Sequence, residues 1–347
     1  MSSRRADAPF YTAISIDLVL RVLHQTVFHP ILVWFVPLAY RAQTFQYHHP
    51  PLYLSAAYAA LVTVFYLIGR LNASLASGPP RAFDWTEEVA LITGGASGLG
   101  LLIAEVYGMR GVSVAVLDVN VPDEGETEAR NVHFYRCDVG DLAAVRSVRA
   151  RVEEELGPVT VLINSAAVVH GKEILEFSDD EVARSIAANI TAHYNTVREF
   201  VPGMVATGKG TVVTMSSVLG ALPAKACGLY APAKAAVTAL HHVLTAEMEG
   251  KGVKTLLVTP GQMSTELFGG VKSPSSFFAP VLEPVDVAKE VIQRIDEGRG
   301  GEVALPLYAK WTPAYWMLPA SVRRALRRWS GMDTAMVGFA GKTKKEL

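Results

Sequence analysis

Residues 88–100 read EVALITGGASGLG, an apolar run followed at once by a glycine-rich turn. The run 88–93 predicts a β-strand, and residues 101–110 predict a helix after the turn. This order suits a dinucleotide pyrophosphate, because the amides and dipole of a helix N-terminus favour an anion. The first gap between the glycines is wider than in the usual dinucleotide-binding fingerprint, G-x-G-x-x-G. The turn alone therefore does not establish a dinucleotide site. The residues expected to hold a cofactor here are Thr93, Gly94, Ser97, Gly98, Leu99 and Gly100.

Short apolar runs alternate with longer amphipathic segments after residue 88. Such alternation predicts βαβ units, in which the strands lie parallel in one sheet. Long helices are expected over 181–204 and from Tyr230 onward. The predicted fold class is therefore α/β, a Rossmann-type doubly wound parallel sheet. Five more strands are predicted at 112–117, 132–137, 159–163, 211–215 and 253–259.

Asp118 ends the second predicted strand, eighteen residues after Gly100. A carboxylate at this place can accept hydrogen bonds from the adenosine ribose hydroxyls, and it would repel a 2′-phosphate. Residues 119–121 contain no lysine or arginine that would bind such a phosphate. The pattern favours NAD over NADP, with a carboxylate that merely closes a strand-end turn as the alternative.

The ends of the other predicted strands carry the remaining cofactor positions. Asp138 and Val139 follow the third strand, where a carboxylate can meet the adenine amine or simply cap a turn. Asn164 follows the fourth strand and precedes small residues, which leave room for the cofactor to cross the strand end. Ligands of open α/β sheets bind at the carboxyl ends of the strands. The same rule adds three residues around the end of the sixth strand: Pro260, Gly261 and Thr265.

Tyr230 and Lys234 are one helical turn apart, so both face the same side of the predicted helix. Together with Ser217, thirteen residues upstream, they indicate a site that moves a hydride and a proton. Tyrosine, with an ordinary pKa of ~10, is a poor base at neutral pH. The ammonium of Lys234 is expected to favour the phenolate, and a pKa lowered by ~3 units corresponds to ~4 kcal/mol.

This ordered set of motifs resembles the short-chain dehydrogenase/reductase family over roughly residues 85–300. The resemblance implies a nicotinamide-dependent oxidoreductase, with Tyr230 as acid or base and Ser217 bonded to the substrate oxygen. It also implies that Asn189 anchors a water linking Lys234 to solvent, and it makes a homodimer possible through the long helices.

One position departs from the family pattern. The usual Asn-Asn-Ala-Gly after the fourth strand is Asn-Ser-Ala-Ala at 164–167. Ala167 in place of glycine is expected to narrow the space beside the nicotinamide or to shift the local turn.

Two N-terminal stretches, 22–40 and 51–69, contain no charged residue and approach the ~20 residues that cross a hydrocarbon core. Pro30 and Pro37 interrupt the first, which is expected to lie in the interface or to form half of a re-entrant hairpin. A buried helical pair of a soluble protein is the alternative. The predicted organisation is an N-terminal membrane anchor of one or two helices at 1–80, a catalytic domain at 85–304 and a C-terminal extension at 305–347.

The C-terminal extension is apolar and basic. Val322, Leu326 and Trp329 share one face of a predicted helix, and four arginines lie off that face. This is the pattern of an amphipathic helix in a membrane interface, with a basic helix packed on the domain as the alternative. Together with the loop 263–284, the segment 305–330 is expected to form an apolar mouth that takes substrate from the bilayer.

The layout resembles the membrane-anchored retinol and 17β-hydroxysteroid dehydrogenase-like enzymes of endoplasmic reticulum and lipid droplets. The shared features are the N-terminal anchor, the strand-end Asp118 and the apolar C-terminal extension. The tail 344–347, KKEL, resembles a dilysine retrieval signal, which is read in the cytosol. These features predict a membrane protein of the endoplasmic reticulum or lipid droplet, with its catalytic domain facing the cytosol.

Composition excludes other classes. The net charge of -1 argues against a nucleic-acid partner. The two cysteines, Cys137 and Cys227, are too few for a disulfide framework, and no metal-ligand spacing is present. Hydrophobic residues make up 50% of the chain, an excess that the N-terminal stretches help to explain.

The sequence thus predicts an NAD-dependent oxidoreductase that interconverts a lipophilic alcohol and its ketone or aldehyde. A retinoid, a sterol and a long-chain fatty alcohol all remain open as the substrate. One alternative is an NADPH-dependent lipid ketone reductase. The other is a catalytically silent scaffold on a membrane or lipid droplet.

Overall fold

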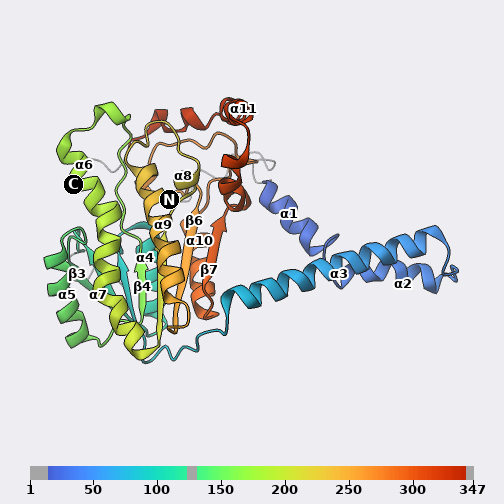
Figure 1. The fold of residues 1–347 in the computed structure, drawn as a ribbon, viewed down its shortest axis with the longest axis horizontal. Coiled ribbons are helices and arrows are strands. Elements are labelled where there is room, and N and C mark those ends of the chain that lie inside the picture. The colour runs from blue at the N-terminus through green and yellow to red at the C-terminus, as the bar shows by residue number, and fades with distance from the viewer. Residues whose placement is uncertain (1–14, 123–130, 341–347) are drawn as a thin grey trace. The chain divides into compact units, whose positions relative to one another are not determined.

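The structure is a computed structural model that describes residues 15–122 and 131–340 (Figure 1). It divides between Pro79 and Pro80 into two compact units, called here the N-terminal unit and the α/β unit. The tail 344–347, interpreted as a retrieval signal, lies outside the described residues.

The α/β unit is built on one seven-stranded sheet whose order is β3-β2-β1-β4-β5-β6-β7, with every neighbouring pair parallel. The predicted α/β class with a doubly wound parallel sheet is confirmed. β7 has no counterpart among the predicted strands, because only its last three residues are apolar. The strands are β1 Val89–Thr93, β2 Ser113–Asp118, β3 Val132–Arg136, β4 Val161–Asn164, β5 Gly210–Met215, β6 Val253–Pro260 and β7 Gly301–Leu305.

Helices cover both faces of the sheet (Figure 1), so the central strands are buried on both sides. On one face, Ile103 and Val291 from two helices belong to the core cluster that contains Ile92. On the other, Met204 and Leu244 belong to the core cluster that contains Leu162. The helices of the first face are α4 Gly98–Met109 and α10 Pro284–Asp296; those of the second are α5 Leu142–Glu155, α7 Ala192–Thr207 and α9 Tyr230–Met248.

The segment predicted as one helix at 181–204 is helical but contains a change of pitch. The helix α6 spans Asp179–Ile186 and begins with a capping box between Ser178 and Glu181. A π-helical turn, η4 at Ala187–Thr191, connects α6 to α7. Such turns are rare and occur often at functional sites, and this one contains the buried Asn189.

The N-terminal unit contains one long helix, α3 at Pro50–Ser77. Among the described residues, it is the one helix long and apolar enough to cross a membrane. The first apolar stretch forms no such helix. It is divided among α1 Ile16–Gln25, a 3-10 turn η2 Leu32–Trp34 and α2 Phe35–Ala42.

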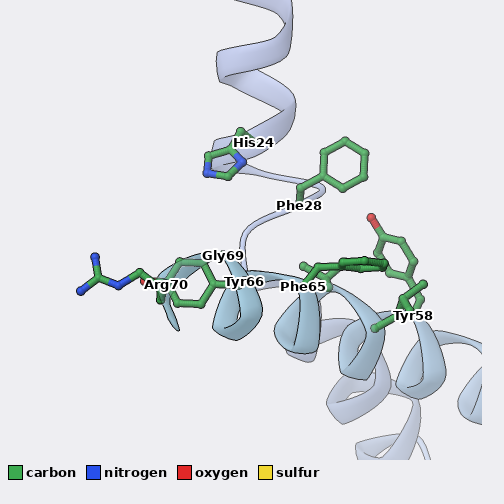
Figure 2. A pocket seen from close by; sticks show the side chains of 9 residues that line it. His24, Phe28, Tyr58, Phe65, Tyr66, Gly69 and Arg70 are labelled. Atoms are coloured by element: carbon green, nitrogen blue, oxygen red, sulfur yellow. The ribbon is translucent and has the colours of Figure 1, made fainter. Parts of the chain in front are cut away.

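The first stretch packs against α3 as a hairpin. Trp34 Nε1 donates to Thr63 Oγ1 at 3.0 Å, and Tyr58 OH donates to Val27 O at 2.7 Å. A hollow of about 500 Å³ separates His24 and Phe28 from the aromatic side chains of α3 (Figure 2). It contains none of the residues that the sequence assigns to catalysis.

Gly94 has a backbone that only glycine adopts without strain. Its φ is +65°, and an added Cβ would lie 2.6 Å from the Cα of Ala166. We expect Gly94→Ala to lower the free energy of unfolding by about 1–3 kcal/mol and to weaken binding of the dinucleotide that the sequence predicts, because the backbone must move. Thermal unfolding in detergent and NADH titration measure both effects.

The matched control is Gly203→Ala in the helix α7, where an added Cβ meets nothing within 4 Å. This variant is expected to be as stable as the wild type or more stable, because alanine is the better helix former. Equal behaviour of the two variants would contradict the role given to the turn.

Candidate active site

The glycine turn joins β1 to α4 in a conformation that glycine makes possible. Gly94 and Gly98 both have positive φ, and a Cβ added to Gly98 would lie 3.9 Å from Thr265 Cγ2. A Cβ on Gly100 would lie 2.5 Å from the carbonyl oxygen of Gly94. Ser97, with an extended backbone, is the N-cap residue of α4, and Leu99 is buried in the core. The free amides of the helix N-terminus therefore lie at the carboxyl edge of the sheet.

Two side chains tie this turn to neighbouring strands. Thr93 Oγ1 accepts hydrogen bonds from the amides of Ser165 and Ala166, at 3.1 and 3.2 Å. The carboxylate of Asp118 accepts from Ala96 N at 3.1 Å and from Asn120 N at 3.0 Å. The ends of β1, β2 and β4 are thus held together around the turn.

The residues after β3 are held mainly by local bonds. Asp138 Oδ1 accepts from Gly140 N at 2.8 Å, the geometry of a side chain that closes its own turn. Asn195 Nδ2 donates to Val139 O at 3.0 Å. Asn195 does not belong to the predicted site, because its bond to Val139 joins segments 56 residues apart in the sequence.

Two buried polar atoms at this edge lack a hydrogen-bond partner among the described residues: Asn164 Nδ2 and Thr265 Oγ1. Asn164 Oδ1 is occupied, since it accepts from Thr196 Oγ1 at 2.8 Å. Unpartnered buried polar atoms are costly in a folded protein. Their presence here, beside the glycine turn, fits a polar cofactor that would satisfy them.

Pro260 and Gly261 lie at the end of β6, next to the unpredicted strand β7. Gly261 N donates to Leu305 O at 2.6 Å. A Cβ on Gly261 would lie 2.7 Å from Pro306 Cδ and 2.9 Å from Tyr308 OH. The segment after β7 thus packs closely against the end of β6, where predicted cofactor residues lie.

Three buried side chains, Ser217, Tyr230 and Lys234, come together beyond β5. Ser217 is the N-cap of the short helix α8, Val218–Ala221, and its side chain hydrogen-bonds that of Tyr230. Lys234 Nζ lies 5.5 Å from the centre of the Tyr230 ring and donates to Met215 O at 2.7 Å. Serine, phenol and ammonium therefore form one cluster, as the spacing predicts.

The neighbouring Ser216 has a different task. Its hydroxyl donates to Lys234 O at 3.1 Å and shares a 2.6 Å hydrogen bond with Thr238 Oγ1. Ser216 therefore fixes α9 to the end of β5, whereas Ser217 faces Tyr230.

The electrostatics of the cluster differ from the expectation. Burial raises the pKa of Tyr230, and the hydrogen bond with Ser217 lowers it by less. Burial also lowers the pKa of Lys234 to about 8, so most of this ammonium stays charged at neutral pH. The protein alone thus holds Tyr230 as a phenol, because the loss of water outweighs the effect of its neighbours.

Asn189 is locked in place within the π-helical turn. Its Oδ1 accepts from Val168 N at 2.9 Å, and its Nδ2 donates to Val168 O at 3.0 Å and to Ser185 Oγ at 3.1 Å. The side-chain amide of Asn189 is thus occupied by bonds within the protein.

His193 is a buried neighbour that no sequence motif reveals. It follows Asn189 by one helical turn, and neither of its ring nitrogens has a partner among the described residues. Burial, followed by the charge of Lys234, lowers the pKa of His193 to about 3. The imidazole is therefore neutral and adds no second cation beside the lysine.

Ala167 causes no left-handed turn. Among the described residues other than glycine, only Thr44 and Ala226 have positive φ. The backbone after β4 therefore accommodates alanine where the family pattern has glycine.

The pH dependence of the stability of Lys234→Met, compared with that of the wild type, tests whether the ammonium of Lys234 is buried. The wild-type pKa falls from 10.5 to about 8 on folding, so the unfolded chain binds more protons between these pH values. The free energy of unfolding therefore rises by about 3 kcal/mol as the pH increases from about 8 to 10.5. Below about pH 8, the full cost of burying the charged ammonium is present. We expect the variant to lose this rise. Parallel pH profiles of thermal unfolding in the two proteins would contradict the assignment.

Comparison with known proteins shows which family and which solved structure this chain is similar to. A family model described as short chain dehydrogenase matches residues 88–275. A crystal structure of a short-chain dehydrogenase from Streptomyces avermitilis superposes with a TM-score of 0.58 at 26% identity, covering 70% of this chain and 96% of that one.

Curated relatives extend the match. Short-chain dehydrogenase/reductase 3 of Homo sapiens is 30% identical, covering 76% of this chain and 90% of the relative. Epidermal retinol dehydrogenase 2 of Homo sapiens is 30% identical, covering 74% and 87%. Estradiol 17-beta-dehydrogenase 11 of Pongo abelii is 30% identical, covering 63% and 74%.

Proposed function

The chain belongs to the short-chain dehydrogenase family, and on that premise we propose that it is a membrane-associated, NAD-dependent dehydrogenase of a lipophilic alcohol. An oxidoreductase that uses a nicotinamide cofactor follows from the family and the fold. The observation that carries the proposal is the buried cluster of Ser217, Tyr230 and Lys234, at the same carboxyl edge of the parallel sheet as the glycine turn.

The substrate class rests on the relatives and on the apolar surroundings. Two relatives are named for retinol and estradiol, which are both lipophilic alcohols. In this chain, the ring of Phe268 lies edge-on to Tyr230, with ring centres 5.4 Å apart. Phe268 also packs against an apolar cluster of Cys227, Ala231 and Met336. We infer a retinoid, a sterol or a long-chain alcohol as the substrate.

The choice of NAD rests on Asp118. Its carboxylate ends β2 beside the glycine turn, where it would accept hydrogen bonds from ribose hydroxyls and repel a 2′-phosphate. One observation favours the NADPH-dependent reductase as second candidate: Arg136 on β3 is the register partner of Asp118 and would attract a phosphate.

In the proposed mechanism, the cofactor when bound supplies the hydride acceptor, held by the glycine turn, Asp118 and Asn164. Ser217 orients the substrate by a hydrogen bond to its oxygen, and Tyr230 takes the hydroxyl proton as the hydride leaves the carbon. The raised pKa keeps Tyr230 protonated at neutral pH, so that the phenol holds the proton needed in the reverse, reductive direction. For oxidation, Lys234 and the cationic nicotinamide would favour the phenolate.

Proton exchange with solvent is assigned to the lysine and the π-helical turn. Lys234 already donates to Met215 O, and its remaining protons are available to the cofactor ribose and a water. Asn189 is a positioning residue that fixes the turn through Val168, and the turn would hold that water.

Membrane association rests on α3, whose exposed apolar side chains extend over a helix of spanning length. We propose that α3 anchors the chain in the endoplasmic reticulum or lipid-droplet surface. The orientation proposed places the α/β unit in the cytosol, where the nicotinamide pool is available.

The proposal is tested by turnover of the full chain in nanodiscs with retinol, a steroid alcohol and a long-chain alcohol, each with NAD⁺ or NADP⁺. We expect NADH formation with at least one lipophilic alcohol, and none with a short water-soluble alcohol. Faster turnover with NADP⁺ would favour the second candidate. Cofactor binding without turnover of any alcohol or ketone would favour the scaffold.

A further inference from the structure

The surface after β7 exposes large apolar side chains. The segment comprises the 3-10 helical stretch η6, Leu307–Met317, and the helix α11, Ala320–Ser330. No residue of α11 is buried, and Trp311, Met317 and Trp329 are 70%, 86% and 71% exposed. Here the exposed apolar residues of the two stretches are called the platform: Trp311, Trp316, Met317, Val322, Leu326 and Trp329.

A second segment, distant in sequence, extends the platform. The ring of Phe278 lies 5.7 Å from that of Trp329, and Phe277 lies 4.9 Å from Phe278. Both phenylalanines are themselves exposed. Contiguous exposed apolar patches of this kind mark binding surfaces in soluble domains.

Basic side chains of α11 flank the platform. The sequence of α11, ASVRRALRRWS, has four arginines and no acidic residue. Arg327 pairs with Asp333, and Arg323 lies over the ring of Trp316 at 5.0 Å. Arg324 and Arg328 are exposed and have no ion pair within the described part of the chain. Two guanidinium groups thus remain available to an external anion.

Exposed tryptophans with unpaired arginines beside them match a bilayer surface. Tryptophan settles at the headgroup level, and arginine binds phosphate in a bidentate manner. A helix with an apolar stripe and a basic face lies in the interface plane and binds anionic lipid most strongly. We propose that the platform is a membrane contact of the α/β unit, distinct from α3, that binds the surface of an anionic phospholipid bilayer.

The platform adjoins the active site. Trp316 Nε1 donates to Ala221 O at 2.7 Å, and Ala221 ends the helix α8 that Ser217 caps. In Figure 1, α11 lies at the end of the sheet toward which β7 runs. Contact at the platform therefore places the carboxyl edge of the sheet at the bilayer. Delivery of substrate from lipid would follow only if the proposed function holds; the membrane contact does not rest on it.

Matched cysteine variants of the full chain test the contact. Met317→Cys lies on the platform, whereas Met109→Cys, at the C-terminal end of α4, replaces a similarly exposed methionine away from it. The native Cys137 and Cys227 are buried, so a nitrobenzoxadiazole probe is directed to the introduced thiol. Each labelled protein is reconstituted in vesicles of phosphatidylcholine, with or without phosphatidylserine, containing a doxyl-labelled quencher lipid.

We expect the probe at position 317 to be quenched several-fold more than that at 109, with more quenching in the phosphatidylserine vesicles. Arg324→Glu combined with Arg328→Glu should remove most of the additional quenching. The matched charge reversal, Lys209→Glu with Lys251→Glu, is placed before β5 and β6 and should change nothing. Thermal unfolding confirms that each variant keeps its fold.

Equal, weak quenching at 317 and 109 would overturn the proposal. Quenching at position 317 that changes neither with phosphatidylserine nor with the two arginine reversals would overturn the claim that the platform recognises anionic lipid. Protection of the probe at 317 without lipid quenching, together with disulfide cross-linking between two Met317→Cys copies, would make the platform a self-association surface instead. None of these readouts depends on hydride transfer. Failure of the membrane contact would therefore leave the proposed function standing, and failure of the proposed function would leave the membrane contact standing.

Discussion

Tyr230→Phe is expected to lower kcat by about 10²–10⁴-fold, because the variant lacks the group that exchanges a proton with the substrate oxygen. The phenyl ring still packs edge-on against Phe268, so the fold should persist. NADH binding should also persist, since the glycine turn and Asp118 are untouched. Steady-state turnover of a lipophilic alcohol, with NADH titration alongside, separates the two effects.

Tyr107→Phe provides the matched control. Tyr107 is a buried tyrosine on α4 whose hydroxyl has no hydrogen-bond partner among the described residues. It lies against Trp85 with ring centres 4.9 Å apart, outside the predicted site. Its variant should retain wild-type turnover. Activity of Tyr230→Phe within tenfold of the wild type would show that the acid or base has been misassigned.

Asp118→Ala is expected to raise the Kd for NADH about 10–100-fold, because charge-assisted hydrogen bonds to the ribose are each worth about 1.5–3 kcal/mol. The loss includes the support that the carboxylate gives to the glycine turn through Ala96 N. NADPH should gain relative to NADH, since the repulsion of its phosphate disappears. Fluorescence titration with both cofactors measures the change in preference.

Asp118→Asn separates charge from shape in this prediction. The amide oxygen can still accept from Ala96 N, so the glycine turn should keep its form, while the bond from Asn120 N and the negative charge are lost. We expect this variant to bind NADPH better than the wild type does. Wild-type protein that prefers NADPH, with neither variant changing the preference, would transfer the cofactor assignment to Arg136.

The fold was predictable because its signals are local. An apolar run before a glycine turn determines the first βαβ unit, and parallel strands buried on both faces are continuously apolar. The strand β7 escaped prediction, because it starts with a glycine and an exposed glutamate and leaves only Val303, Ala304 and Leu305 as apolar signal. Its pairing with β6 supplies the stability that its own sequence lacks.

The candidate site was predictable where spacing limits geometry. Tyr230 and Lys234 share a helix face, so their proximity needed no tertiary information. The buried His193 and the locked Asn189 depend on packing between elements, which the sequence pattern does not contain. The raised pKa of Tyr230 likewise depends on burial in the folded site.

The N-terminal stretch 22–40 approaches the length of a membrane helix in apolar composition, and its prolines predict an interrupted segment. The structure divides it: α1 ends at Gln25, before Pro30, and Pro37 lies in the first turn of the short α2. A count of apolar residues over a window takes no account of proline. Proline has no backbone N–H to donate to a helical hydrogen bond, so it interrupts a helix that composition alone would allow. The continuous run in α3 has no such interruption after its first turn.

The central claim is hydride transfer from a lipophilic alcohol to NAD⁺ at the cluster of Ser217, Tyr230 and Lys234. It is tested most directly by incubating the full chain in nanodiscs with NAD⁺ and a lipophilic alcohol deuterated at the carbinol carbon. Mass spectrometry of the recovered NADH then reports the origin of the transferred atom. We predict deuterated NADH from the wild type and almost none from Tyr230→Phe. Absence of deuterated NADH from wild-type protein that binds NADH would contradict the claim.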